Sequence, residues 1–351
     1  MDDTDDTSAQ RKTDHLRIAL DDASVQRPGD ANGLERYHFE ALSLPEIDLD
    51  TVDTSCTLLG KELRAPLLVG AMTGGTSDAG RINRVLAEAA EHCRVGFCLG
   101  SQRSMLAGDV GDAASFRVRD VAPKTLIIGN IGAIQVRDKV DGGQLEALAD
   151  SVGADAMFIH LNPLQEAIQP EGDRDWRGIL DAIGRTASEC GLPVLVKEVG
   201  MGLSEQSLQA LSQTGISGVE TAGVGGTSWA GIEALRHGSR TPRAIAGEVL
   251  RGFGTPTAVC VQLARHSFPG RLVIASGGLR NGLEVAKCIG LGADAAAMAW
   301  PFLIAAQDGV EAAVNEIEGV IQTLRTVMFL VGAPTLSHLG STPLLPANER
   351  R

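Results

Sequence analysis

A short segment at residues 158–166, FIHLNPLQE, joins an apolar run to a dense group of polar side chains. Its first residues have the character of a buried strand, and directly after them come His160, Asn162, Gln165 and Glu166. An imidazole and two amides can hydrogen-bond to a phosphate, and a carboxylate offers the hard oxygen that Mg²⁺ prefers. Taken alone, the segment is equally consistent with an ordinary strand-to-helix loop that stops at Pro163. Its chemistry therefore depends on which other segments the fold brings beside it.

Eight short apolar runs could supply the strands that such a site needs. Each run is almost continuously apolar, as a parallel strand buried on both faces should be. Most of them begin about 25–40 residues apart, which leaves room for a crossover helix. Amphipathic patterns predict helices at Arg81–His92, Leu145–Val152 and Ser204–Thr214. The predicted strands are Leu67–Ala71, Val95–Leu99, Leu126–Ile131, Ala156–Leu161, Pro193–Val199, Gly218–Ala222, Leu272–Ser276 and Ala295–Ala299.

This alternation predicts an α/β protein built on a (β/α)₈ TIM barrel, and a doubly wound open sheet is the alternative. We expect residues 1–10 to be a disordered acidic leader and residues 11–66 to be an N-terminal extension that packs on the barrel. The barrel is expected over residues 67–335, and residues 336–351 form a C-terminal tail. Residues 223–271, after the sixth strand, predict a long loop that could cover a site.

Composition restricts the classes of function. A net charge of −13 argues against a general nucleic-acid binder, although it does not exclude a phosphorylated metabolite. The six cysteines include no CxxC pair, which favours free thiols in a reducing cytoplasm. The acidic start lacks the features of a signal peptide, and no apolar run approaches the roughly 20 residues of a membrane span. We therefore expect a cytoplasmic protein with no membrane partner.

The carboxyl ends of the predicted strands carry small or polar residues, and in a barrel these ends converge on one face. A single glycine turn is more often only a tight loop, so the argument rests on this convergence. The turn Ser276–Arg280 is more specific, because it follows a strand and opens a helical pattern at Asn281–Ile289. Glycines there let backbone N–H groups approach a phosphate, and the helix N-terminus favours the anion. Thr227, in a second glycine turn, could add a hydroxyl.

Two groups of cations stand out by position. Lys197 interrupts the apolar run PVLVKEV, where a charge is costly unless it faces a partner. It is either an outward-facing or paired lysine, or a cation at the barrel mouth beside an electron-rich ring such as a flavin. Arg11 and Lys12 precede His15 in the pattern RKxxH. They are either a solvated helix start or two cations that fold over the mouth towards a second phosphate.

Together these segments resemble the type 2 isopentenyl-diphosphate isomerase family, whose members are FMN-dependent barrels. The resemblance runs from residue 11 to the last predicted strand in the family's order. Glycine turns are shared with many FMN barrels, whereas RKxxH with HLNPLQE is more particular to this family. The matching segments are RKTDH (11–15), PLLVGAMTGGT (66–76), GSQR (100–103), GNIG (129–132), HLNPLQE (160–166), VKEVG (196–200), AGVGGTSW (222–229) and SGGLRNG (276–282).

The resemblance implies a role for each matching position. FMN would lie against Ala71, Met72, Thr73, Ser101, Asn130 and Lys197, with its phosphate at Thr227, Gly277, Gly278, Met298 and Ala299. The substrate diphosphate would meet Arg11, Lys12, Arg103, His160, Asn162 and Gln165, and Glu166 would hold Mg²⁺. NADPH or NADH would reduce the flavin, and the chain would form a homo-oligomer, a tetramer or an octamer. One position departs from the family: Ala222 replaces a usual serine, so one hydrogen bond to FMN, typically about 1 kcal/mol, is absent.

The implied reaction converts isopentenyl diphosphate to dimethylallyl diphosphate by a 1,3-proton shift, a redox-neutral step of isoprenoid biosynthesis. We hypothesise that reduced FMN gives and takes the protons, with its N5 facing the alkene. The reason is that few ionisable groups remain once the diphosphate and Mg²⁺ ligands are assigned. Gln165 is then the protein group closest to the chemistry, either orienting the substrate or taking part in proton transfer.

Three rival functions fit the sequence less well. An FMN-dependent 2-hydroxy-acid oxidase or dehydrogenase needs a histidine base and an arginine clamp after a late strand, and the segment 222–229 has neither. A barrel that acts on purine nucleotides through a loop cysteine is disfavoured, because no cysteine occupies a glycine-rich strand end. A non-catalytic flavin- or phosphate-binding barrel would keep the glycine turns but would not need RKxxH or HLNPLQE.

Overall fold

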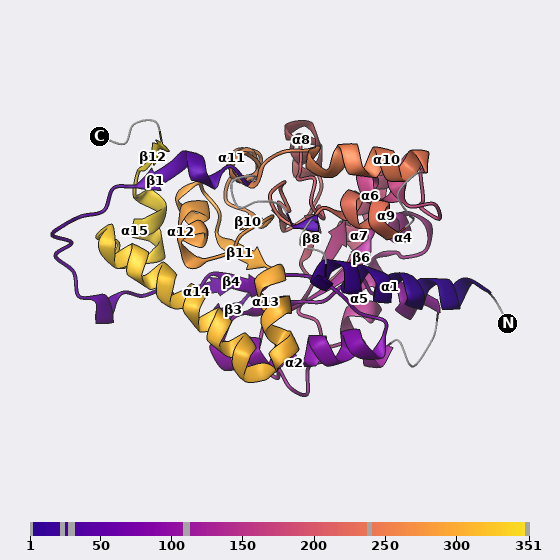
Figure 1. The fold of residues 1–351 in the computed structure, drawn as a ribbon, viewed down its shortest axis with the longest axis horizontal. Helices are drawn as coiled ribbons and strands as arrows, with labels where there is room; N and C mark the ends of the chain where they lie inside the picture. Colours follow the sequence, from indigo (N-terminus) through magenta and orange to yellow (C-terminus); the bar gives the residue numbers. More distant parts are fainter. Residues whose placement is uncertain (1–2, 22–24, 27–31, 108–112, 237–240, 348–351) are drawn as a thin grey trace.

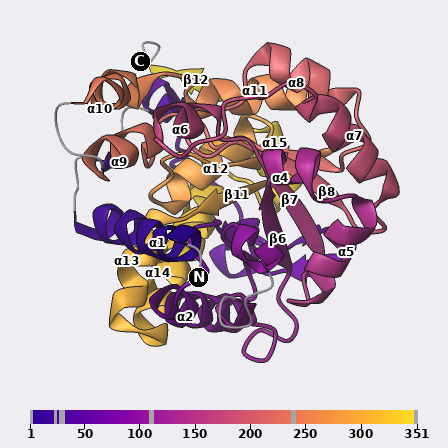
Figure 2. The same ribbon diagram turned by 90° about the vertical axis from the view of Figure 1, so that its right-hand side faces the viewer.

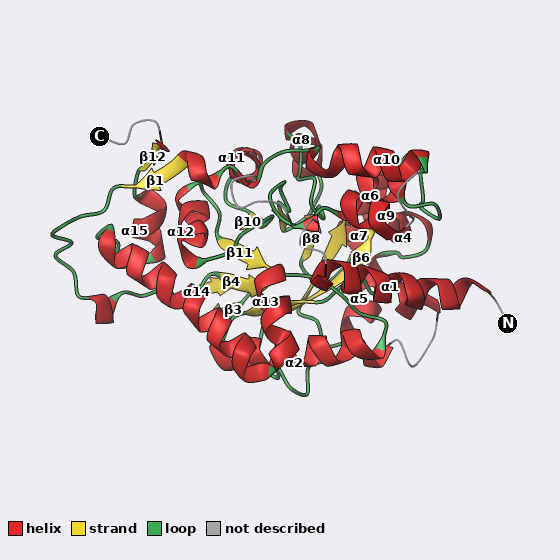
Figure 3. Cartoon of the chain, viewed as in Figure 1, coloured by secondary structure: helices red, strands yellow, loops and turns green. Residues whose placement is uncertain are grey.

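Eight parallel strands close into a single barrel surrounded by helices (Figure 1, and by element type in Figure 3). This computed structural model describes residues 3–21, 25–26, 32–107, 113–236 and 241–347. The predicted TIM barrel is confirmed, and the open sheet is excluded because β11 pairs with β4 and closes the ring. The barrel strands are β4 (Leu67–Val69), β5 (Gly96–Cys98), β6 (Ile127–Gly132), β7 (Ala156–His160), β8 (Val194–Lys197), β9 (Gly218–Glu220), β10 (Leu272–Ala275) and β11 (Ala295–Met298).

Seven of the predicted apolar runs contain one of these strands, and the run Leu126–Ile131 covers all of β6 except Gly132, because both faces of every strand are covered. Alternate side chains point inward, so Ile128, Phe158 and Leu195 belong to one cluster that fills the barrel. Their neighbours along the strands pack outward against the helices in a second, larger cluster. The hairpin of β2 (Cys56–Leu58) and β3 (Lys61–Leu63) directly precedes β4 and adds Leu58 and Leu63 to the inner cluster. This hairpin therefore seals the amino end of the barrel interior.

The helices form where apolar residues recur at helical spacing between capping residues. In α2 (Ser77–Cys93) the Thr76 hydroxyl accepts from the N–H of Ala79, and the C-cap of the helix is Arg94, whose φ of 55° is left-handed. The other α-helices are α1 (Asp3–Asp21), α4 (Ala133–Asp138), α5 (Gly142–Asp150), α6 (Pro163–Ile168), α7 (Ile179–Glu189), α8 (Glu205–Ser212), α9 (Trp229–Arg236), α10 (Pro242–Val249), α11 (Thr257–Ser267), α12 (Gly282–Gly290), α13 (Trp300–Ala305), α14 (Val310–Leu330) and α15 (Leu336–Ser341). Short 3-10 helices lie at η3 (Leu34–Arg36), η4 (Leu49–Thr51), η5 (Arg103–Ala107), η6 (Leu250–Gly252) and η7 (Ala306–Asp308).

The N-terminal segment differs from our expectation. Residues 3–10, which we predicted to be part of a disordered leader, are the first turns of α1. We took their acidic composition as a sign of disorder, but negative charge is also favourable at the start of a helix. α1 packs beside α9 and α13, across the mouth of the barrel (Figure 2).

Two further segments are more ordered than the sequence suggested. The predicted C-terminal tail contains α15 and the strand β12 (Leu344–Pro346), which pairs antiparallel with β1 (Tyr37–Phe39) of the N-terminal extension. The predicted long loop after β9 is folded into α9, α10 and η6 before the crossover helix α11. Its glycines and Pro242 punctuate short helices, and Pro242 stands in the first turn of α10, where proline is tolerated.

In the described part of the chain, no helix combines the length and the apolar character needed to cross a membrane.

Candidate active site

A cavity of about 270 Å³ lies at the carboxyl ends of the barrel strands, beneath α1. All the residues that the sequence predicted for a site line this cavity, so the structure brings the complete set together. From α1 and the loop after β5 come Arg11, Lys12, Ser101 and Arg103, and from the β7–α6 segment come His160, Asn162, Gln165 and Glu166. The remaining strand ends supply Ala71, Met72, Thr73, Asn130, Lys197, Ala222, Thr227, Gly277, Gly278, Met298 and Ala299.

One side of the cavity gathers positive charge. Burial, followed by the positive charges of Arg103 and Arg236, lowers the pKa of Arg11, even though Glu171 acts in the opposite direction. Lys12 donates to the Ser104 hydroxyl at 3.0 Å and lies over the ring of Phe116. Cations that crowd together in this way are stabilised by a polyanion placed between them.

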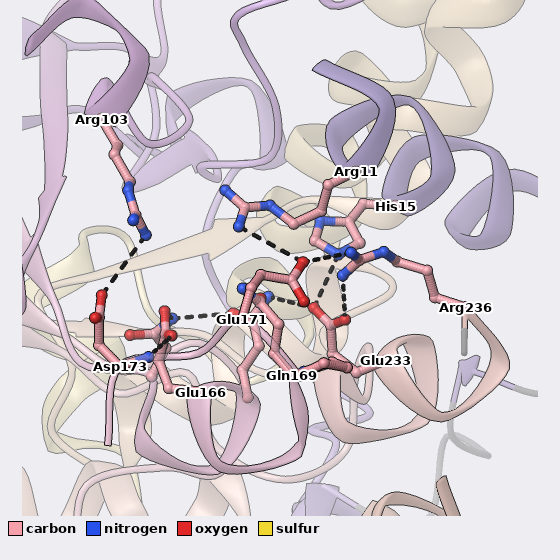
Figure 4. Close-up of polar contacts among 12 residues, drawn as sticks. Arg11, His15, Arg103, Glu166, Gln169, Glu171, Asp173, Glu233 and Arg236 are labelled. Carbon is pink, nitrogen blue, oxygen red and sulfur yellow. Dashed lines mark hydrogen bonds and ion pairs between the residues drawn. The ribbon is translucent and has the colours of Figure 1, made fainter. Parts of the chain in front are cut away.

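A buried carboxylate, Glu233 of α9, connects α1 to α6 (Figure 4). One oxygen, Oε1, accepts from His15 at 2.9 Å and from Gln165 at 3.0 Å, while Oε2 accepts from Arg236 at 2.7 Å. The amide of Gln169, oriented by its partners, also donates to Oε1. Burial alone would raise the pKa of Glu233, but His15, Gln165 and Arg236 lower it to about 2. Glu233 is therefore an ionised acceptor that fixes its donors.

Gln165 and Glu166 are held by neighbours on the same short segment. The Asn162 amide nitrogen donates to Gln165 Oε1 at 3.2 Å and to Glu166 Oε1 at 3.0 Å. The second Glu166 oxygen accepts from the backbone N–H of Asp173 at 2.8 Å. Because Gln165 also donates to Glu233, both ends of its amide are fixed. The carboxylate of Glu166 keeps lone pairs for a further ligand.

The surroundings of His160 favour the neutral imidazole. Burial, followed by the nearby charges of Lys197 and Arg103, lowers its pKa to about 3. Its Nδ1 faces Asn130 Oδ1 at 2.9 Å, so Nδ1 carries the proton if the Asn130 amide is oriented as drawn. Nε2 is then an acceptor. An anion beside His160 would favour either a second proton on the ring or rotation of the Asn130 amide.

Two glycine turns meet backbone to backbone at the opposite end of the cavity. A Cβ on Gly278 would lie 2.2 Å from the carbonyl of Gly225, and one on Gly226 would lie 2.6 Å from the nitrogen of Gly278. Gly277 and Gly278 both have positive φ, which only glycine adopts easily. The turns therefore form a cradle without side chains, which lets backbone N–H groups approach a bound anion. Beside it, the Thr227 hydroxyl is hydrogen-bonded to Gln26 at 2.8 Å.

Several residues in the cavity wall or directly behind it were not among the predicted site residues. His15 belonged to the RKxxH pattern but received no separate role, while Glu233, Gln169 and Arg236 were not singled out. Glu220 could have been noticed in the same way as Lys197, because it is a charge within an apolar strand run. Glu233 gave a weaker signal, since a glutamate on a helix is usually solvent-exposed.

The comparisons with known proteins agree with this geometry. The sequence model of the FMN-dependent dehydrogenase family matches residues 165–345. A protein of Nostoc sp. named isopentenyl-diphosphate delta-isomerase is 43% identical over 330 residues, which cover 94% of this chain and 93% of that protein. The chain belongs to the isopentenyl-diphosphate delta-isomerase family. A relative of the same name from Methanosarcina barkeri is 41% identical over 97% of this chain and 92% of its own length.

Solved structures with the same barrel fold include two oxidases. A mandelate oxidase variant with (S)-mandelic acid has a TM-score of 0.64 at 16% identity and covers 98% of this chain and 97% of its own. A lactate oxidase of Pediococcus acidilactici has a TM-score of 0.68 at 14% identity and covers 98% of this chain and 93% of its own. At these identities the likeness concerns the fold alone.

Proposed function

We propose that this chain is a type 2, FMN-dependent isopentenyl-diphosphate isomerase, converting isopentenyl diphosphate to dimethylallyl diphosphate by a 1,3-proton shift. The observation that carries the proposal is that one cavity combines two anion sites of different construction. The cations Arg11, Lys12 and Arg103 line one side, and the glycine cradle at Gly277 and Gly278 lines another. A diphosphate substrate and a phosphorylated flavin require two such sites, with the reacting groups between them.

The residues present fit FMN. Its phosphate would occupy the glycine cradle beside Thr227, Met298 and Ala299, and its ring would lie against the residues from Ala71 to Thr73, Ser101 and Asn130. Lys197 supplies a buried cation, 5% exposed, on the cavity wall. A cation there stabilises the negative charge of a reduced flavin. Ala222 lines the same wall with a methyl group, in place of a side chain that could donate a hydrogen bond to the cofactor.

The residues also fit a magnesium ion held mainly by substrate. No cluster of three or more metal-ligating side chains exists among the residues that the structure describes. Mg²⁺ commonly binds through one or two carboxylates together with substrate phosphates and water. Glu166 is the carboxylate for such a site, because it is 7% exposed, is fixed by Asn162 and lies on the segment that carries His160.

Reduced FMN would supply the acid and the base of the proton shift. The protein then binds and orients the substrate: Arg11, Lys12, Arg103, His160 and Asn162 hold the diphosphate. Gln165 is the side chain we place nearest the reacting carbons. Its amide is fixed by Asn162 on one side and by the ionised Glu233 on the other, which supports an orienting role. α1 covers this group from solvent, and water excluded in this way cannot capture a developing carbocation.

An anaerobic isomerase assay with purified protein tests the proposal. Product is expected only when FMN, a reductant and Mg²⁺ are all present. NADPH is the proposed reductant, with NADH as the alternative. Because the reaction is redox-neutral, dithionite should replace NADPH, and NADPH consumption should be far below product formation. Activity that persists without flavin would overturn the proposal.

A second assay separates the roles within the site. Replacement of Gln165 by Leu and reconstitution with 5-deaza-FMN should each lower kcat strongly, while Gln213→Leu on the surface should not. If the Gln165 variant and the 5-deaza enzyme both kept normal turnover, the proposed acid–base scheme would be wrong.

Assembly and location are further parts of the proposal. We propose a homo-oligomer, either a tetramer or an octamer, supported by the exposed apolar side chains Ile245, Val249 and Phe253 on α10 and after η6. Light scattering after gel filtration gives the mass that decides this. We also propose a reducing compartment, the cytoplasm, since all six cysteines are free thiols.

A further inference from the structure

Three polar residues form a continuous row across neighbouring strands at the cavity. His160 of β7 is the register partner of Lys197 on β8, and Lys197 is in turn the partner of Glu220 on β9. Paired residues of parallel strands point to the same side, and all three line the cavity. The pKa of His160 is lowered to about 3, which favours the neutral imidazole, and the other two members of the row are one basic and one acidic side chain.

Glu220 is fixed on one side and open on the other. Its Oε1 accepts from the Ser276 hydroxyl at 2.8 Å, and Ser276 in turn accepts from the N–H of Ala222 at 2.9 Å. Its Oε2 is buried and has no hydrogen-bond partner in the structure. Three other buried polar atoms of the described chain also lack partners, but Glu220 is the residue among these four that lines the cavity.

Negative charge on a carboxylate that is 3% exposed, with one oxygen unpaired, is costly unless a cation or a ligand compensates it. Lys197 is the neighbouring cation, yet it does not form a direct ion pair with Glu220. Its Nζ donates instead to the backbone carbonyl of Glu198 at 2.7 Å. Both charges nevertheless act on the same space, because Glu220 raises the pKa of the buried Cys98 thiol, after burial itself, while Lys197 opposes the rise.

We infer that Glu220 is a positioning residue that offsets Lys197 at the cofactor wall, so that it lowers the midpoint potential of the bound flavin. The inference rests on the proposed FMN site. Lys197 alone would strongly favour the electron-rich, reduced flavin. A carboxylate one strand away opposes the added electrons, because like charges in a buried site repel strongly. The row therefore sets how strongly the protein prefers reduced over oxidised FMN.

The test measures the potential of the flavin and not only activity. Apoprotein is titrated with FMN by fluorescence quenching, and the midpoint potential of the holoprotein is measured against a reference dye at one pH. Glu220→Gln should increase the preference for reduced over oxidised FMN about tenfold, a positive shift of about 30 mV for a two-electron couple. Lys197→Gln should shift the potential in the negative direction, and the double variant should lie between the two single variants.

Two further variants distinguish an effect of the Glu220 charge from a general structural effect of the substitution. Glu220→Asp keeps the charge and should stay near the wild-type potential, even if shortening the side chain lowers thermal stability. Glu198→Gln is the matched control, because Glu198 is buried to the same degree but its Oε2 accepts four backbone N–H groups of residues 199–202 and the residue does not line the cavity. This variant should leave the potential unchanged.

The outcomes separate this inference from the proposed function. Wild-type protein that does not bind FMN at all would overturn the proposed function and this inference with it. If wild type binds FMN but Glu220→Gln leaves the potential unchanged, the FMN site stands and the role of Glu220 is refuted. An equal shift in Glu198→Gln would also refute it, because the effect would then belong to any buried carboxylate.

Discussion

The lowered pKa of the partly buried His160 predicts how the stability of this protein depends on pH. Its pKa is about 3 in the folded chain, whereas a free imidazole has a value of 6.5. Between these two values the unfolded chain binds a proton that the folded chain does not, so the free energy of unfolding rises with pH. His160 therefore lowers stability as the pH falls below 6.5, and its effect is complete only below 3.

The size of the effect at moderate acidity follows directly. At pH 5 the unfolded imidazole gains about 2 kcal/mol from protonation that the folded protein forgoes, and at pH 8 it gains almost nothing. This difference depends on the unfolded pKa and hardly on the folded one, as long as the folded pKa lies well below 5. Replacement of His160 by Gln removes the proton site. Between pH 8 and pH 5, the free energy of unfolding of the variant should therefore fall by about 2 kcal/mol less than that of wild type.

Urea unfolding at a series of pH values, followed by both fluorescence and circular dichroism, measures this difference. Coincident transitions from the two probes are needed, because a chain of this size often unfolds through intermediates. His92→Gln on the exposed surface of α2 is the matched control and should follow wild type. Parallel pH profiles for wild type and His160→Gln would refute the assignment of a neutral imidazole at His160.

Three other predictions concern the site and the core. Pyrophosphate should raise the pKa of His160, because a polyanion stabilises the imidazolium, and an NMR titration of the His160 ring with and without pyrophosphate would show this; an unchanged ring titration would place the anion elsewhere. Glu233→Gln should lower the free energy of unfolding by about 3 kcal/mol at pH 7. The pKa of Glu233 is about 2 in the folded chain and 4.5 in the unfolded chain, so its contribution to stability is fully present above pH 4.5 and is lost as the pH falls through 2. Unchanged urea midpoints would contradict the role of this carboxylate. Phe158→Ala in the barrel interior should cost about 3–5 kcal/mol, whereas Leu180→Ala, 41% exposed, should change stability by less than about 0.5 kcal/mol; equal losses would contradict the packing.

The barrel could be predicted from the sequence because its signal is local. Each strand is buried on both faces, so an apolar run such as Ala156–Leu161 marks it without knowledge of its neighbours. The chemistry at the strand ends was equally visible, since His160, Lys197 and Glu166 stand where apolar residues stop. A barrel brings the carboxyl ends of all its strands to one face, and for this reason the polar residues at separate strand ends line one cavity.

The missed features depend on contacts between distant segments. Nothing in the local sequence of Glu233 shows that His15, 218 residues away, hydrogen-bonds to it. The pairing of β1 with β12 is equally invisible, because each strand is three residues long and only partly buried. The prediction of disorder for residues 3–10 was wrong for another reason. Charged residues favour both disorder and the first turn of a helix, and composition does not separate the two.

The pairing of β1 with β12 has a consequence for how the chain folds. It joins Tyr37 to Pro346, so a segment that is synthesised first finds its partner among the last residues made. A contact with so large a sequence separation closes a very long loop, and it forms only after the barrel between has brought its ends together. During synthesis, β1 of the N-terminal extension therefore has one edge unpaired until β12 has been made.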